Sequence, residues 1–112
     1  MNAYELTPLI AELQAGRRWF EVLRVPALSV GLYTLKAGEA DPQQPHTEDE
    51  VYYVLRGRAV VQVGREDRPV GPGSLIYVPA TEPHRFHAIT EDLTLLVVFA
   101  PAEGTRAPSA AP

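Results

Sequence analysis

The side chains with the clearest potential for chemistry lie in residues 38–57, where ligand-type residues lead directly into an apolar run. His46 and Glu50 stand four residues apart at the start of this run, and both side chains can bind a metal ion. Because alternate residues of an extended chain share a face, Gln44, His46 and Glu50 can all point in one direction. Tyr52 has the same parity, so the binding face continues into a core face. The chain has no cysteine, which leaves histidines and carboxylates as metal ligands.

A second stretch with ligand potential covers residues 73–88. It reads as a turn, a short strand, a proline-bounded turn and a strand that opens with His84. Phe86 has the parity of His84, so we expect it to line the same wall. His87 has the opposite parity, and we expect it to face outward.

The remaining pattern is typical of an all-β chain. Eleven prolines and eight glycines imply many turns between short strands. The predicted strands cover residues 17–25, 28–35, 51–55, 59–63, 75–78, 84–89 and 93–99. Arg56-Gly57-Arg58 predicts a hairpin turn between two of these strands. A short helix is expected over residues 8–15, with Thr7 as its cap.

Length and composition indicate one domain. The 112 residues allow a single core, which we expect to span residues 1–100. Residues 101–112 are rich in Ala and Pro, and we predict a flexible tail because this segment can bury little apolar surface. The net charge of −4 gives no reason to expect nucleic-acid binding. No apolar run approaches the roughly 18 residues of a membrane span. The N-terminus lacks the pattern of a signal peptide, so we expect a cytoplasmic protein.

The two ligand-rich stretches resemble the two motifs of the cupin family of small β-barrels. The first motif is matched by Gly38, His46, Glu50 and Gly57, with Gln44 in place of its first histidine. The second motif is matched by Gly73, Pro79 and His84, with Thr81 and Ala88 in place of its glycine and asparagine. The resemblance implies a double-stranded β-helix, or jelly-roll barrel, preceded here by a short helix.

The resemblance also implies that His46, Glu50 and His84 lie on adjoining strands and face into the barrel. Two imidazoles and one carboxylate on one face of a metal leave positions open for substrate or dioxygen. Gln44 could add its amide oxygen as a weak ligand. We therefore expect one divalent metal ion, and Fe, Mn, Ni, Cu and Zn all suit this ligand set. The alternative is a cupin whose metal site has decayed, with hydrogen-bonded pocket histidines.

The favoured function is a metal-dependent enzyme that acts on a small molecule, with a dioxygenase as the first choice of class. Tyr52 and Phe86 would shape the substrate pocket, and the sequence identifies no catalytic residue beyond the metal ligands. One alternative is a non-catalytic module that binds a small molecule or a metal. Another is a sugar isomerase or epimerase, with Glu48 or Glu50 as its base. Otherwise Glu48 is interpreted as a solvated loop residue.

A homodimer is expected from the strand that begins at Trp19. Residues 19–25 carry apolar side chains on both faces, and one barrel covers only one of them. A second subunit would cover the other face, and small cupins commonly dimerise. The alternative is that the helix at residues 8–15 folds back over this face within one chain.

Overall fold

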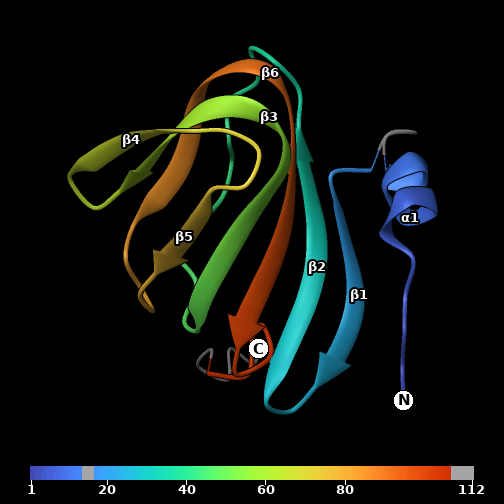
Figure 1. Cartoon of the computed structure of the whole chain (residues 1–112). Coiled ribbons are helices and arrows are strands. Elements are labelled where there is room, and N and C mark those ends of the chain that lie inside the picture. Colours follow the sequence, from blue (N-terminus) through green and yellow to red (C-terminus); the bar gives the residue numbers. More distant parts are fainter. Residues whose placement is uncertain (14–16, 107–112) are drawn as a thin grey trace.

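The computed structural model describes residues 1–13 and 17–106, and it shows six strands and one short helix in these ranges (Figure 1). The elements are α1 (Leu6–Leu13), β1 (Trp19–Val25), β2 (Leu28–Leu35), β3 (Asp49–Val63), β4 (Glu66–Val70), β5 (Leu75–Val78) and β6 (His84–Ala100). The predicted all-β fold with an N-terminal helix is confirmed. In these two ranges no helix has the length and apolar character needed to cross a membrane.

The helix begins earlier than expected. It starts at Leu6, so Thr7 lies inside its first turn instead of capping it. The expected end of the helix at residue 15 lies outside the described residues.

The strands form one antiparallel sheet in the order β1-β2-β6-β3-β4, with β5 paired to β3 away from this path. β6 follows one edge of β3 for nearly its whole length, from Asp49 to Val63. The other edge of β3 is shared in succession. Its first part, from Glu50 to Tyr53, pairs with β5, and its last part, from Ala59 to Val63, pairs with β4.

The prediction of a hairpin at Arg56-Gly57-Arg58 is wrong, because β3 continues through these residues without a break. Gly57 has a φ of 96°, which lets the strand bend sharply instead of reversing. A side chain at this position would meet the carbonyl of Asp92 on β6. The two strands predicted at 84–89 and 93–99 are likewise one bent strand, β6. The β3–β6 ribbon therefore arches over, as Figure 1 shows, and closes the barrel.

The main core lies inside this arch. Side chains that alternate along β3 and β6 fill it, including Tyr52, Val54, Phe86, Leu95 and Phe99. Each is at most 2% exposed. Full burial of an aliphatic or aromatic side chain of this size contributes about 1.5–3 kcal/mol to stability. The strands that carry the site are therefore anchored in a well-packed core.

A second apolar cluster covers the outer face of the sheet. Ile10 and Leu13 of α1 pack on Leu32 of β2, with Phe20 and Val22 of β1 beside them. The helix thus covers, within one chain, the apolar outer face of β1 that we expected a second subunit to cover. The apolar residues of β1 therefore give no reason to expect a dimer.

The expected domain boundary at residue 100 is too early. Ala102 is only 2% exposed, and the backbone N–H groups of Gly104 and Arg106 donate hydrogen bonds to Glu48. Residues 101–106 therefore belong to the folded domain. The rest of the predicted tail, residues 107–112, lies outside the described residues.

Candidate metal centre

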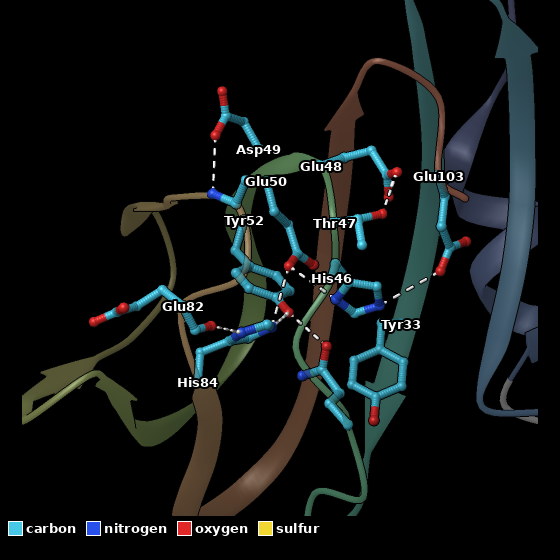
Figure 2. Close-up of polar contacts among 12 residues, drawn as sticks. Tyr33, His46, Thr47, Glu48, Asp49, Glu50, Tyr52, Glu82, His84 and Glu103 are labelled. Carbon is cyan, nitrogen blue, oxygen red and sulfur yellow. Dashed lines mark hydrogen bonds and ion pairs between the residues drawn. The ribbon is translucent and has the colours of Figure 1, made fainter. Parts of the chain in front are cut away.

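The structure brings His46, Glu50 and His84 together at one end of the barrel (Figure 2). One ligand atom from each residue lies within 4.8 Å of the other two. Glu50 Oε1 is 3.1 Å from Nε2 of His84 and 3.4 Å from Nδ1 of His46. Glu50 and His84 are buried, and the His46 side chain is 22% exposed at the mouth of the site.

Three different elements deliver these side chains. His46 lies in the loop before β3, Glu50 at the start of β3 and His84 at the start of β6. The turn after β5 fixes the loop, because the backbone N–H of Thr81 donates to the carbonyl of His46 at 2.6 Å. Val78, the last residue of β5, pairs with Glu50 of β3. The strand that precedes His84 therefore lies directly beside the strand that carries Glu50.

Three buried polar atoms of this group have no hydrogen-bond partner among the described residues: Nδ1 of His46 and both carboxylate oxygens of Glu50. Their contacts with the neighbouring rings are at ion-pair distance but lack hydrogen-bond geometry. Buried polar atoms are almost always satisfied, and an unsatisfied one costs about 1–3 kcal/mol. Imidazole nitrogens and a carboxylate aimed at one point are the donor set of a divalent transition metal. The residues therefore fit a metal ion.

A chain of hydrogen bonds sets the orientation of His84. The Gln43 amide N–H donates to Asp41 at 2.7 Å, so the Gln43 amide oxygen is free to accept the Tyr52 hydroxyl at 2.6 Å. The Tyr52 proton is thereby used, and the Tyr52 oxygen turns its lone pairs to Nε2 of His84 at 3.1 Å. Nδ1 of His84 donates to the carbonyl of Glu82 at 3.0 Å. Nε2 of His84 consequently faces only oxygen acceptors, so this nitrogen either carries a proton or binds a metal ion.

The ionisable groups of the site shift one another's pKa values. Burial lowers the pKa of His46, but the carboxylates of Glu103 and Glu50 outweigh this effect and raise it to about 9. Burial likewise lowers the pKa of His84, and Glu50 with the Glu82 carbonyl raises it on balance. Burial raises the pKa of Glu50, and the two histidines with Tyr52 lower it on balance. Without a metal, the Glu50 carboxylate therefore favours the protonated form of both imidazoles, and a metal competes with these protons.

A cavity of about 140 Å³ adjoins the three residues. Its lining comprises Trp19, Tyr33, Gln43, His46, Glu50, Val97, Phe99 and Glu103. Three aromatic rings therefore line the cavity together with the ligand-type residues, and the Phe99 ring lies against His46, with centroids 4.7 Å apart. A cavity of about 150 Å³ is large enough for a molecule the size of benzene.

Trp19 forms the aromatic wall of this cavity from β1. Its ring meets Tyr33 and Phe99 edge to face, with ring centroids 6.4 and 6.2 Å apart. Gly31 of β2 makes this position available, since any side chain there would meet the indole ring. The glycine thus lets an aromatic side chain from one strand lie across the next and reach the cavity.

The structure departs from the expected register at Gln44. Residues 41–46 form no strand, so alternation along the chain does not hold there, and Gln44 is exposed. Its neighbour Gln43 lines the cavity instead. Tyr52 and Phe86 point into the barrel as predicted, but neither lines the cavity. Tyr52 contacts His84, and Phe86 packs edge to face on the Tyr52 ring, with centroids 5.0 Å apart.

The interpretation of Glu48 as a solvated residue is wrong. The side chain is 1% exposed and accepts hydrogen bonds from the backbone of Gly104 and Arg106 and from the hydroxyl of Thr47. His87 faces outward as expected, with Nε2 2.8 Å from Asp67.

Sequence reasoning missed the cavity residues Gln43, Trp19 and Glu103. Of these, only Gln43 gave a local signal, since it adjoins Gln44 in the first motif. Glu103 follows the last strand in a segment without any chemical motif.

Comparisons with known proteins show the family and support the fold. A family model described as a cupin domain matches residues 31–99. A protein of Streptomyces coelicolor, described as uncharacterized, is 50% identical over 104 residues, which cover 92% of this chain and 99% of that relative. A crystal structure of a protein from Thermus thermophilus is similar with a TM-score of 0.70 at 30% identity, covering 91% of this chain and 99% of the other. The crystal structure of the DMSP lyase DddQ from Ruegeria pomeroyi gives a TM-score of 0.64 at 26% identity, over 68% of this chain and 39% of that one.

Proposed function

This chain belongs to the cupin family, and we propose that it is a metal-dependent enzyme acting on a small organic molecule, with a dioxygenase as the favoured class. The observation that carries this proposal is the convergence of His46, Glu50 and His84, with three of their buried polar atoms unpartnered among the described residues. These residues would hold one divalent ion of Fe, Mn, Ni, Cu or Zn. When bound, such an ion would supply Lewis acidity and open positions for substrate and dioxygen.

The other residues of the site would bind and orient the substrate. Trp19, Tyr33 and Phe99 would hold its apolar part against their rings. The Gln43 amide is fixed by Asp41 and in turn fixes the Tyr52 hydroxyl, so this hydroxyl would hold His84 in position. The closely packed aromatic wall would exclude water from the reacting atoms.

The cavity supports a substrate of limited size. A volume of about 140 Å³ is close to that of a cavity that holds benzene, which favours a compact substrate over a sugar phosphate. No lysine or arginine is among the residues that line this cavity, so a phosphate would find no cationic partner in its wall. The sugar isomerase is further disfavoured because Glu48, one candidate base, is engaged by the backbone of Gly104 and Arg106.

Elemental analysis of protein purified without chelator tests the proposal. We expect one Fe or Mn per chain, and loss of this metal in His46→Ala and His84→Ala. His87→Ala is the matched control, because His87 is the third histidine of the chain and lies on the exterior. Oxygen uptake by the iron-loaded protein is then measured with a panel of benzene-sized organic compounds. Wild-type protein that takes up no metal, or histidine variants that keep it, would contradict the ligand set. Metal binding without turnover of any compound would favour the non-catalytic binding module.

We also propose that the protein forms a homodimer through the outer face of β5. Leu75 and Tyr77 are 71% and 58% exposed, and Tyr53 of β3, which pairs with Leu75, is 41% exposed. These residues form an apolar strip on the exterior of the barrel. Light scattering tests the dimer, and a mass near the 12.3 kDa of one chain would rule it out. Leu75→Asp is expected to yield the monomer.

A further inference from the structure

The segment that follows β6, residues 101–106, is attached to the barrel by specific contacts. Ala102 is 2% exposed, and the backbone N–H of Glu103 donates to the hydroxyl of Ser29 at 2.9 Å. The guanidinium of Arg24 donates to the carbonyl of Glu103 at 2.8 Å. β1 and β2 therefore hold the backbone of Glu103 on both sides. The point from which its side chain extends is consequently determined by the fold.

A buried carboxylate holds the end of the same segment. Glu48 Oε1 accepts the N–H of Gly104 at 2.9 Å, and Oε2 accepts the N–H of Arg106 at 2.8 Å. Glu48 is 1% exposed and takes no part in the ligand group. It lies between His46 and Glu50 in the chain, so the C-terminal segment is tied to the stretch from the loop into β3 that carries two of the proposed ligands. These hydrogen bonds satisfy the buried carboxylate of Glu48, which has no role in the proposed chemistry.

The side chain of Glu103 lies at the mouth of the cavity, against His46 (Figure 2). Its Oε2 is 3.5 Å from Nε2 of His46, whereas Nδ1 of the same ring faces Glu50 at 3.4 Å. The two nitrogens of one imidazole therefore face two different carboxylates. Only Glu50 belongs to the converging ligand group. With a metal at the centre, Nδ1 would bind it beside Glu50, and the carboxylate of Glu103 would stabilise the remaining ring proton on Nε2.

His84 shows the same division of roles with a different partner. Its Nδ1 donates to the carbonyl of Glu82, and its Nε2 faces Glu50. Each proposed imidazole ligand thus has one nitrogen directed at the centre and the other facing an oxygen acceptor. Metal-binding histidines are usually oriented in this way.

On the basis of the metal site proposed above, we infer that Glu103 is a positioning residue of the centre. From its ion-pair distance of 3.5 Å, its carboxylate stabilises the proton on Nε2 of His46 and so favours the tautomer whose Nδ1 binds the metal. Glu48 holds the segment that carries Glu103, so residues 101–106 are a wall of the metal centre.

Zinc affinity of the full chain, measured by competition with a chromophoric chelator, tests this role. Glu103→Ala removes the acceptor, and we expect zinc binding to weaken about 10- to 100-fold, as loss of such partners typically does. Glu103→Gln keeps a neutral acceptor, so its loss should be smaller. Glu91→Gln is the matched control, because Glu91 is an exposed carboxylate at the ribbon bend, paired with Arg58. Its affinity should equal that of the wild type.

Ring ¹⁵N spectra of the zinc-loaded protein give a readout that a purely structural role would not change. The chain has three histidines, and His87 serves as the internal reference. We expect His46 to show a protonated Nε2 and a zinc-bound Nδ1 in the wild type, and to lose this fixed tautomer in Glu103→Ala. Zinc bound through Nε2 of His46, or equal affinities in wild type and Glu103→Ala, would overturn the role of Glu103 while the metal site stands. Failure of the wild type to bind zinc would overturn the proposed metal site itself.

Discussion

Glu50 Oε1 and His84 Nε2 lie 3.1 Å apart although the two residues stand at opposite ends of the β3–β6 ribbon. Glu50 pairs with Phe99 at one end, and His84 pairs with Val63 at the other. The ribbon brings these ends together because both strands bend where Gly57 lies against Asp92. The metal centre is therefore closed by a bend far from it, and the integrity of that bend can be tested.

Gly57→Ala is expected to destabilise the protein by more than the conformational cost alone. Gly57 has a φ of 96° and no room for a side chain beside Asp92. Gly73 is the matched control, since it has a φ of 92° but nothing within 4 Å. We expect Gly73→Ala to cost about 1–2 kcal/mol, the usual penalty for this conformation, and Gly57→Ala at least twice as much. Urea denaturation measures both values. Equal losses would show that the bend tolerates a side chain.

Gln44→His restores the cupin pattern in the sequence but is not expected to strengthen zinc binding. Gln44 is exposed and is not among the residues that line the cavity, so an imidazole there would lie away from the centre. Gln43→Leu is expected to weaken binding, because it removes the acceptor of the Tyr52 hydroxyl. Isothermal titration of both variants with zinc provides the comparison. A gain in affinity for Gln44→His would show that the loop turns in solution to present this residue.

Zinc affinity is expected to increase as the pH rises towards 9. The pKa of His46 in the metal-free protein is about 9, above the value of about 6.5 for a free histidine. Below pH 9 the metal must therefore displace a proton, and above it this competition ends. Titrations at several pH values measure the trend, with His87→Ala as the control that should not alter it. An affinity independent of pH between 6 and 9 would contradict the raised pKa.

The metal-free protein should show the opposite trend in stability. A folded-state pKa above the unfolded value means that protonated His46 stabilises the fold fully below about pH 6.5. This contribution is lost as the pH rises through about 9. The melting temperature without metal is therefore expected to fall over this interval, and in His46→Ala the fall should be smaller. Calorimetry at both ends of the interval decides between these outcomes.

Truncation separates the two parts of the C-terminus. Removal of residues 107–112 leaves every contact described here in place, so the melting temperature and zinc affinity should match those of the full chain. Removal of residues 103–112 deletes Glu103 and the amides that satisfy Glu48. An unsatisfied buried carboxylate is strongly destabilising, so we expect a fall of several degrees in melting temperature and weaker zinc binding. Identical behaviour of the two truncated proteins would show that residues 103–106 contribute nothing.

The sequence was sufficient to predict the fold and to select His46, Glu50 and His84, because motif spacing is local information. It could not distinguish a hairpin from a bend at Gly57. Both conformations use a glycine with positive φ, and the choice depends on the pairing of β3 with the distant strand β6. The roles of Glu48 and Glu103 were equally inaccessible. Their contacts join segments that are far apart in the chain. Glu48 has the parity of His46 and Glu50, but an acidic loop residue is usually solvated, and Glu103 carries no local pattern that indicates its contact.

The position of Trp19 across Gly31 has a practical consequence. Trp19 is the single tryptophan of the chain, and its indole forms part of the cavity wall. The intrinsic fluorescence of the protein therefore originates mainly from one ring at the position that a bound molecule would touch. A change in emission on adding a compound reports directly that the cavity has been filled, with no label and no assay of turnover. The protein thus carries its own optical probe for a search through candidate substrates.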